Sequence, residues 1–87
     1  MESIEQLRES LVCIGAVDIA EYAADGYEVV TYERYGKRYG LRCKVDDATS
    51  QETARREVYK ALYCKACIRD GKFDKVLQDI SKASESV

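Results

Sequence analysis

The densest run of chemically versatile side chains lies between residues 32 and 42, where cations alternate with tyrosines. Cations can contact phosphates, tyrosines can stack on bases, and a two-stranded ribbon can enter the major groove of DNA. Tyrosine and arginine are also over-represented among the residues that anchor protein interfaces. The run therefore predicts a partner-binding surface. Its candidate contact residues are Arg34, Tyr35, Lys37, Arg38 and Arg42.

Catalytic chemistry has little support in the chain. Histidine is absent, which removes the commonest general base and the usual partner of a nucleophilic serine or cysteine. No glycine-rich phosphate loop follows a strand, because Gly36 and Gly40 fit a turn and a close strand approach better. We therefore expect a protein that is not an enzyme and that carries no cofactor.

Four cysteines raise the question of a metal or redox site. Cys64 and Cys67 have the two-residue gap of a zinc pair, with Cys13 and Cys43 elsewhere in the chain. Residues three apart also share a helix face, however, and this pair lies in an uninterrupted helical pattern. Without a signal peptide we expect reduced thiols, and free cysteine is commonly buried. The sequence favours core packing over zinc, so we expect no metal.

Charge is segregated along the chain, although the formal net charge is only −2. Residues 1–26 carry a single cation, Arg8, whereas residues 27–45 carry five cations and two acidic side chains. The acidic side chains of the first segment are Glu2, Glu5, Glu9, Asp18, Glu21 and Asp25. This acidic segment could meet a basic partner, while the basic one could meet an acidic partner or a nucleic acid.

The first 26 residues predict helical structure. Ser3 and Gln6 form a capping-box pattern, which apolar residues at helical spacing follow. Gly15 weakens that pattern, and Asp18 begins a second capping signature. The segment is therefore either one bent helix or two helices, the second over Ile19–Ala24.

Residues Tyr27–Val45 predict a β-hairpin whose two-residue turn is Gly36 and Lys37. That turn sets Val30 opposite Cys43 and Tyr32 opposite Leu41. A one-residue slip would exchange the two faces, but only this arrangement gathers the apolar side chains. The apolar face holds Val30, Tyr32, Tyr39, Leu41, Cys43 and Val45, and the other holds Val29, Thr31, Tyr35, Arg38, Arg42 and Lys44.

Two further helices are expected after the hairpin. The first is capped by Thr49 or Ser50 and ends at Gly71. Its buried stripe is Ala54, Val58, Ala61, Leu62 and Ile68. The second is short and amphipathic, with Phe73, Val76, Leu77 and Ile80 on its apolar face. Tyr59 and Tyr63 lie off the first stripe and are secondary interface candidates unless they pack on the final helix.

The predicted fold class is therefore α+β, in the order α-β-β-α-α, with the first helix continuous or split. A two-stranded hairpin is not stable alone, so the helices must cover its apolar face unless a partner supplies more strands. We expect a single domain over residues 1–87 with a frayed tail over 81–87. Neither an apolar run of membrane-spanning length nor a signal peptide is present, which predicts a cytoplasmic protein without a membrane partner.

The segment Tyr32–Leu62 resembles the arm-binding domains of phage integrases, because a hairpin is followed by a helix that bears Arg55, Arg56 and Lys60. Those domains use three strands, whereas this sequence predicts two. The resemblance contains no diagnostic motif, so no residue role is carried over.

The function expected from the sequence is a small protein-binding module. Charge segregation and exposed tyrosine fit an inhibitor or regulator of a larger nucleic-acid-handling machine, of the kind that phages and mobile elements encode. The alternative is a DNA- or RNA-binding regulator that uses the basic hairpin, and a homodimer also stays open. Exposed hairpins also carry these residues for stability alone.

Overall fold

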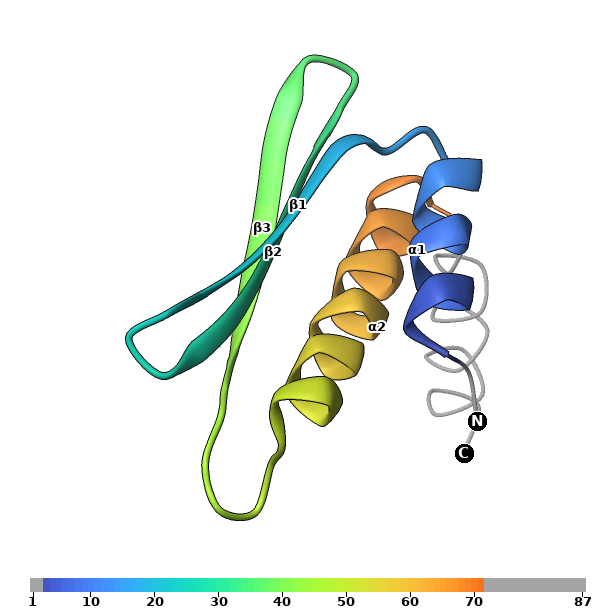
Figure 1. Cartoon of the computed structure of the whole chain (residues 1–87). Helices are drawn as coiled ribbons and strands as arrows, with labels where there is room; N and C mark the ends of the chain where they lie inside the picture. The colour runs from blue at the N-terminus through green and yellow to red at the C-terminus, as the bar shows by residue number, and fades with distance from the viewer. Residues whose placement is uncertain (1–2, 72–87) are drawn as a thin grey trace, which may run out of the picture.

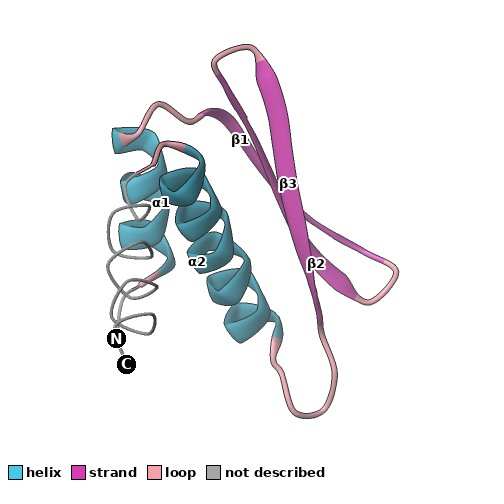
Figure 2. Cartoon of the chain, turned by 180° about the vertical axis from the view of Figure 1, so that it is seen from behind, coloured by secondary structure: helices cyan, strands magenta, loops and turns pink. Residues whose placement is uncertain are grey.

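The computed structural model describes residues 3–71 and contains five elements (Figure 1). They are α1 (Ile4–Cys13), β1 (Val17–Ala24), β2 (Tyr27–Arg34), β3 (Lys37–Lys44) and α2 (Gln51–Arg69). The strands form an antiparallel sheet in the order β1-β2-β3. Both helices lie on the same side of this sheet, where α2 packs on β2 and β3 and α1 packs along α2 (Figures 1 and 2). The α+β class is therefore confirmed, with one strand more than expected.

The additional strand is β1, so the expected helix over Ile19–Ala24 is wrong. Asp25 and Gly26 follow it with φ of 51° and 80°. Such a pair of positive φ angles is what a two-residue hairpin turn requires. Asp25 and Gly26 therefore join two strands rather than end a helix, and pairing with β2 overrides the helix propensity of the three alanines in this segment.

The β2–β3 hairpin forms with a register two residues away from the predicted one. Its turn is Tyr35 and Gly36, with φ of 54° and 76°, and Val30 pairs with Leu41 while Tyr32 pairs with Tyr39. Side chains alternate with a period of two, so a shift of two leaves every strand residue on its predicted face. The predicted apolar face is accordingly the face that packs on the helices.

The helices begin where their caps predict. Ser3 and Gln6 form the expected capping box of α1, and the side chain of Ser50 caps α2. Within α2 the predicted stripe is buried at Ala54, Val58 and Leu62 but half-buried at Ala61, and Ile68 is exposed. The final helix expected at Phe73–Ile80 and the tail over 81–87 lie outside the described residues.

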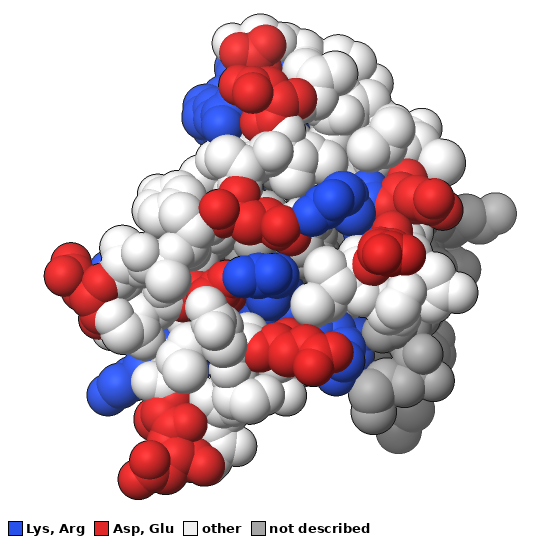
Figure 3. Space-filling view, in the orientation of Figure 1, with Lys and Arg blue, Asp and Glu red and all other residues white. Residues whose placement is uncertain are grey.

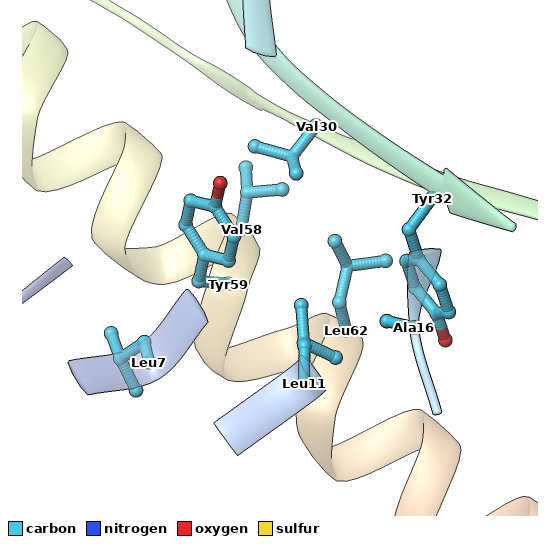
Figure 4. Packing of buried hydrophobic residues seen from close by; sticks show 8 residues of the cluster. All are labelled: Leu7, Leu11, Ala16, Val30, Tyr32, Val58, Tyr59 and Leu62. Atoms are coloured by element: carbon cyan, nitrogen blue, oxygen red, sulfur yellow. The ribbon is translucent and has the colours of Figure 1, made fainter. Parts of the chain in front are cut away.

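The hydrophobic core lies between the sheet and the two helices (Figure 4). Its buried members are Leu7, Leu11, Ala16, Val30, Tyr32, Val58, Tyr59 and Leu62. Leu41 is half-buried beside this core rather than central to it. Because α1 packs along α2, α2 buries a wider arc than one stripe would need, and this arc includes Tyr59.

Candidate binding surface

The face of the sheet that points away from the helices is left open by the described residues (Figures 1 and 2). Alternation defines its members, because the intervening β2 residues, such as Val30 and Tyr32, are buried on the inner face. We call this surface the open face. It consists of Val17, Ala20, Tyr22 and Ala24 from β1, Tyr27, Val29, Thr31 and Glu33 from β2, and Arg38, Gly40, Arg42 and Lys44 from β3.

Tyrosines and an arginine dominate the middle of the open face. The Arg42 guanidinium lies over the Tyr27 ring, 4.4 Å from its centroid, and Tyr22 on the neighbouring strand is 50% exposed. Tyr22 was not predicted as a contact residue because its segment was assigned to a helix, and Tyr27, the first residue of the predicted hairpin, was assigned to neither face. The dipeptide Asp25-Gly26 between them was the signal that could have found both.

A shallow hollow in the open face depends on Gly40. Val29, Thr31 and Arg42 also line it, and Gly40 pairs with Thr31 across the strands. A Cβ atom at Gly40 would lie 2.8 Å from Thr31 Cγ2, so any other residue would force Thr31 to move. The hollow is therefore a feature that this glycine keeps open.

Four of the five predicted contact residues are accessible. Tyr35 is 81% exposed in the β2–β3 turn, and Lys37, Arg38 and Arg42 are also exposed. Lys37 and Tyr35 lie at the tip of the hairpin, and Arg38 and Arg42 lie on the open face. Their predicted exposure is confirmed, whereas their role in binding stays a prediction.

The fifth predicted contact residue, Arg34, is not available to a partner. Its side chain is only 4% exposed, Nε donates a hydrogen bond to the carbonyl of Ile14 at 2.8 Å, and Nη2 bonds to the carboxylate of Asp70. The hydrogen bond to Asp70 raises the pKa of Arg34 above its ordinary value. Arg34 faces inward because it follows Val30 and Tyr32 at a spacing of two, and it joins β2 to the ends of both helices.

Many of the remaining cations already have acidic partners. Arg38 donates hydrogen bonds to Asp18 Oδ2 at 2.7 Å and to Thr31 Oγ1 at 2.9 Å. Three of the five cations of α2, which lies on the opposite side of the sheet, are paired as well: Arg55 with Glu28, Arg56 with Glu52 and Lys60 with Glu57. Within residues 3–71, Lys37, Arg42 and Lys44 are the sheet cations without an ion-pair partner.

Tyr59, a secondary interface candidate, is fully buried instead of exposed. Its hydroxyl donates to Glu21 at 2.5 Å and accepts from Arg8 Nε at 3.3 Å, while Arg8 and Glu21 are also ion-paired at 2.7 Å. Burial and the bond to Glu21 raise the pKa of Tyr59 to about 12. These three residues join α1, β1 and α2, so Tyr59 has a structural role. Tyr63 is half-buried against the core.

Acidic and basic side chains alternate across the face of the molecule that Figure 3 shows. Glu28 of β2 is fully buried, and its carboxylate accepts hydrogen bonds from Arg55 Nη2 at 2.5 Å and from Gln51 Nε2 at 3.1 Å. The hydrogen bond to Glu28 raises the pKa of Arg55. This ion pair therefore helps to hold α2 against β2, at a buried position where apolar packing would otherwise be expected.

The cysteines divide between the core and the surface. Cys67 is buried as predicted and Cys43 is half-buried, but Cys13 and Cys64 are exposed, so core packing does not account for those two. Over residues 3–71 no group of three potential metal ligands is close enough to hold an ion. In the same part of the chain, neither helix combines the length and apolar character that crossing a membrane requires.

Fold and surface together define a small α+β protein whose three-stranded sheet has helices on one face and exposed tyrosine and arginine on the other. Comparison of the chain with protein-family models, with curated proteins and with solved structures finds no match. Its function is therefore inferred from this surface.

Proposed function

We propose that the protein is a small protein-binding module whose open face and β2–β3 turn contact a larger protein. The observation that carries this proposal is a sheet face on which tyrosines lie beside Arg42, while Arg38 of the same face is bound to Asp18 and Arg34 of the hairpin is buried. Tyr22, Tyr27 and Arg42 form a surface of the composition that anchors protein interfaces. The small size and the segregated charge further favour an inhibitor or regulator of a nucleic-acid-handling machine.

A DNA- or RNA-binding regulator is the second candidate. The sheet has three strands, as do the integrase domains that the sequence resembles, and sheets can place strands in a groove of DNA. Affinity for a polyanion, however, comes largely from free cations that displace counterions. Arg34 is buried and Arg38 is bound to Asp18, so the hairpin has fewer free cations than its sequence implies. This loss of free charge makes protein the favoured ligand.

Charge reversal at two unpaired cations tests the proposal. Lys37→Glu/Arg42→Glu alters the tip and the open face, while Lys60→Glu/Lys65→Glu makes the same change in net charge on α2. Nuclease-treated lysates of the expressing cells are passed over each immobilised protein. We expect wild type and the α2 variant to retain the same partner and the sheet variant to lose it by about tenfold or more, about 1.4 kcal/mol.

Two results would contradict the proposal. Retention of the partner by the sheet variant, folded as judged by circular dichroism, would make the open face merely structural. Partner capture that disappears with nuclease, together with direct binding of mixed-sequence DNA or RNA that falls steeply with salt, would instead support the nucleic-acid regulator.

A further inference from the structure

The two edge strands of the sheet differ in how well they resist pairing with another strand. β3 carries Lys37, Arg38, Arg42 and Lys44, and cations on an edge discourage pairing with a further strand. β1 carries no cation and no proline, and three of its eight residues are Ala20, Ala23 and Ala24. β1 is therefore the edge that another strand could approach.

The backbone of β1 offers hydrogen-bonding groups on its free side. The two-residue turn makes Ala24 and Tyr27 the closing hydrogen-bonded pair. Alternation then directs the N–H and C=O of Tyr22 toward β2 and those of Glu21 and Ala23 toward the free side. Among the described residues no other backbone bonds to that side, and no strand lies beyond β1 in either view (Figures 1 and 2).

The surroundings of this edge are acidic. Asp25 follows the strand directly, is exposed and makes no ion pair within residues 3–71, whereas the Asp18 carboxylate in β1 is already bound to Arg38. Arg8 reaches Glu21 at 2.7 Å, so α1, which also carries the exposed acidic residues Glu5 and Glu9, borders the same edge. A second copy of β1 would bring acidic residues against acidic residues, which is unfavourable, whereas a lysine- or arginine-bearing strand would be attracted.

We propose that β1 receives an extended, basic segment of the partner protein, which adds a fourth strand to the sheet. Such strand addition takes its affinity from main-chain hydrogen bonds and its specificity from alternate side chains. The backbone groups of Glu21 and Ala23 supply the hydrogen bonds, and one set of the added side chains lies beside Tyr22. This inference rests on the proposed protein-binding function and names the element that the partner contributes.

The experiment selects random peptides, long enough to span β1, on the immobilised full chain and compares two proline variants. Ala23→Pro removes a donor from the free side of β1 without removing a sheet hydrogen bond. Asp47→Pro serves as the control, because it also introduces a proline but lies in the loop between β3 and α2, at the second position of the turn that the Thr49 N–H closes on the Asp46 carbonyl. We expect enriched peptides that bear lysine or arginine, that bind Ala23→Pro about tenfold or more weakly, and that bind Asp47→Pro as they bind wild type.

Amide chemical shifts locate the bound peptide and complete the test. Changes confined to Val17–Ala24 and the adjoining β2 residues support strand addition, and changes centred on β3 or α2 overturn it. Enrichment of acidic peptides only, or of none, also overturns it, as does a wild-type dimer that Ala23→Pro dissociates. If the Lys37→Glu/Arg42→Glu variant loses the cellular partner while Ala23→Pro retains it, the proposed function stands and the inference about β1 fails.

Discussion

Two buried tyrosines differ in whether the hydroxyl has a partner. Tyr59 bonds to Glu21 and Arg8, whereas the Tyr32 hydroxyl has no hydrogen-bond partner among the described residues. An unsatisfied buried hydroxyl costs about 1–3 kcal/mol. We expect Tyr32→Phe to raise the free energy of unfolding by about 1 kcal/mol and Tyr59→Phe to lower it by about 1 kcal/mol. Urea denaturation measures both, and a loss of stability in Tyr32→Phe would contradict this assignment.

Glu21 should make stability depend on pH in the acidic range. Partial burial opposes its ionisation, but hydrogen bonds from Tyr59 and Arg8 outweigh burial and lower the pKa of Glu21 below the ordinary 4.5. A lowered folded-state pKa gives stability that is present above pH 4.5 and is lost as the pH falls through the folded value. Unfolding free energies should therefore fall below pH 4.5, and more steeply in wild type than in Glu21→Gln. Parallel curves for the two proteins would exclude this role.

The contact residues show which features of the site could be predicted from the sequence and which could not. The exposure of Lys37 followed from its place in the predicted turn, and that of Tyr35 and Arg42 followed from the alternation of side chains along the strands. Arg34 follows the same alternation, but its inward position requires an acidic partner for the guanidinium, and Asp70 lies 36 residues further along the chain. Sequence patterns do not identify such a distant pair, and Arg34 was therefore predicted to be a contact residue.

At the scale of elements, two glycines in the sheet are required for different reasons. Gly26 has a positive φ and free space around it, whereas Gly40 faces Thr31 Cγ2 at 2.8 Å from an added Cβ. Gly26→Ala should cost about 1–2 kcal/mol from backbone strain, and Gly40→Ala about 1–3 kcal/mol from overpacking. Thr31→Ser removes Cγ2 and should recover stability in Gly40→Ala only. Additivity of Thr31→Ser with both variants, measured by thermal unfolding, would refute the steric explanation.

The contact between α2 and the sheet depends on a buried ion pair. Glu28 is fully buried, and its carboxylate is held by Arg55. Removing one partner of such a pair leaves an uncompensated charge, so Arg55→Met should lower the free energy of unfolding by about 3 kcal/mol. The double variant Arg55→Met/Glu28→Met should recover much of that loss, because neither charge remains. If the double variant is as unstable as Arg55→Met, packing rather than charge explains the loss.

Elements were predicted best where a local signal determined them. The capping residues Ser3 and Ser50 placed both helix starts, and alternation placed on the correct face those β2 and β3 residues that were assigned to one. The segment Val17–Ala24 was misassigned because alanine favours helix, and its strand forms only through pairing with β2. Tyr59 was misplaced for a similar reason, since its burial results from α1 packing along α2, and that packing is tertiary.

For the whole molecule, the sequence predicted the α+β class and the segregation of charge, and the fold gives this segregation a geometry. Acidic residues gather on α1 and β1, while the unpaired cations of the sheet lie on β3. The opposite edges of one sheet therefore carry opposite charge. We expect this arrangement to attract a basic partner to β1, as proposed, and to limit the affinity for a polyanion, whose only free cationic contacts on the described sheet would be Lys37, Arg42 and Lys44.

The three free cations of the described sheet set an upper limit on the salt dependence of nucleic acid that binds on the sheet. The logarithm of the affinity falls with the logarithm of salt concentration by about 0.9 for each neutralised phosphate of duplex DNA, so the slope should be no steeper than about −3. The formal net charge of −2 weakens the attraction further.

Fluorescence anisotropy with a mixed-sequence duplex at several salt concentrations should therefore show weak binding with a shallow slope. Because Lys37→Glu/Arg42→Glu removes two of the three cations, it should flatten that slope, whereas Lys60→Glu/Lys65→Glu should leave it unchanged. A wild-type slope well beyond −3 would require phosphate contacts outside the sheet and would favour the nucleic-acid regulator over the protein-binding module.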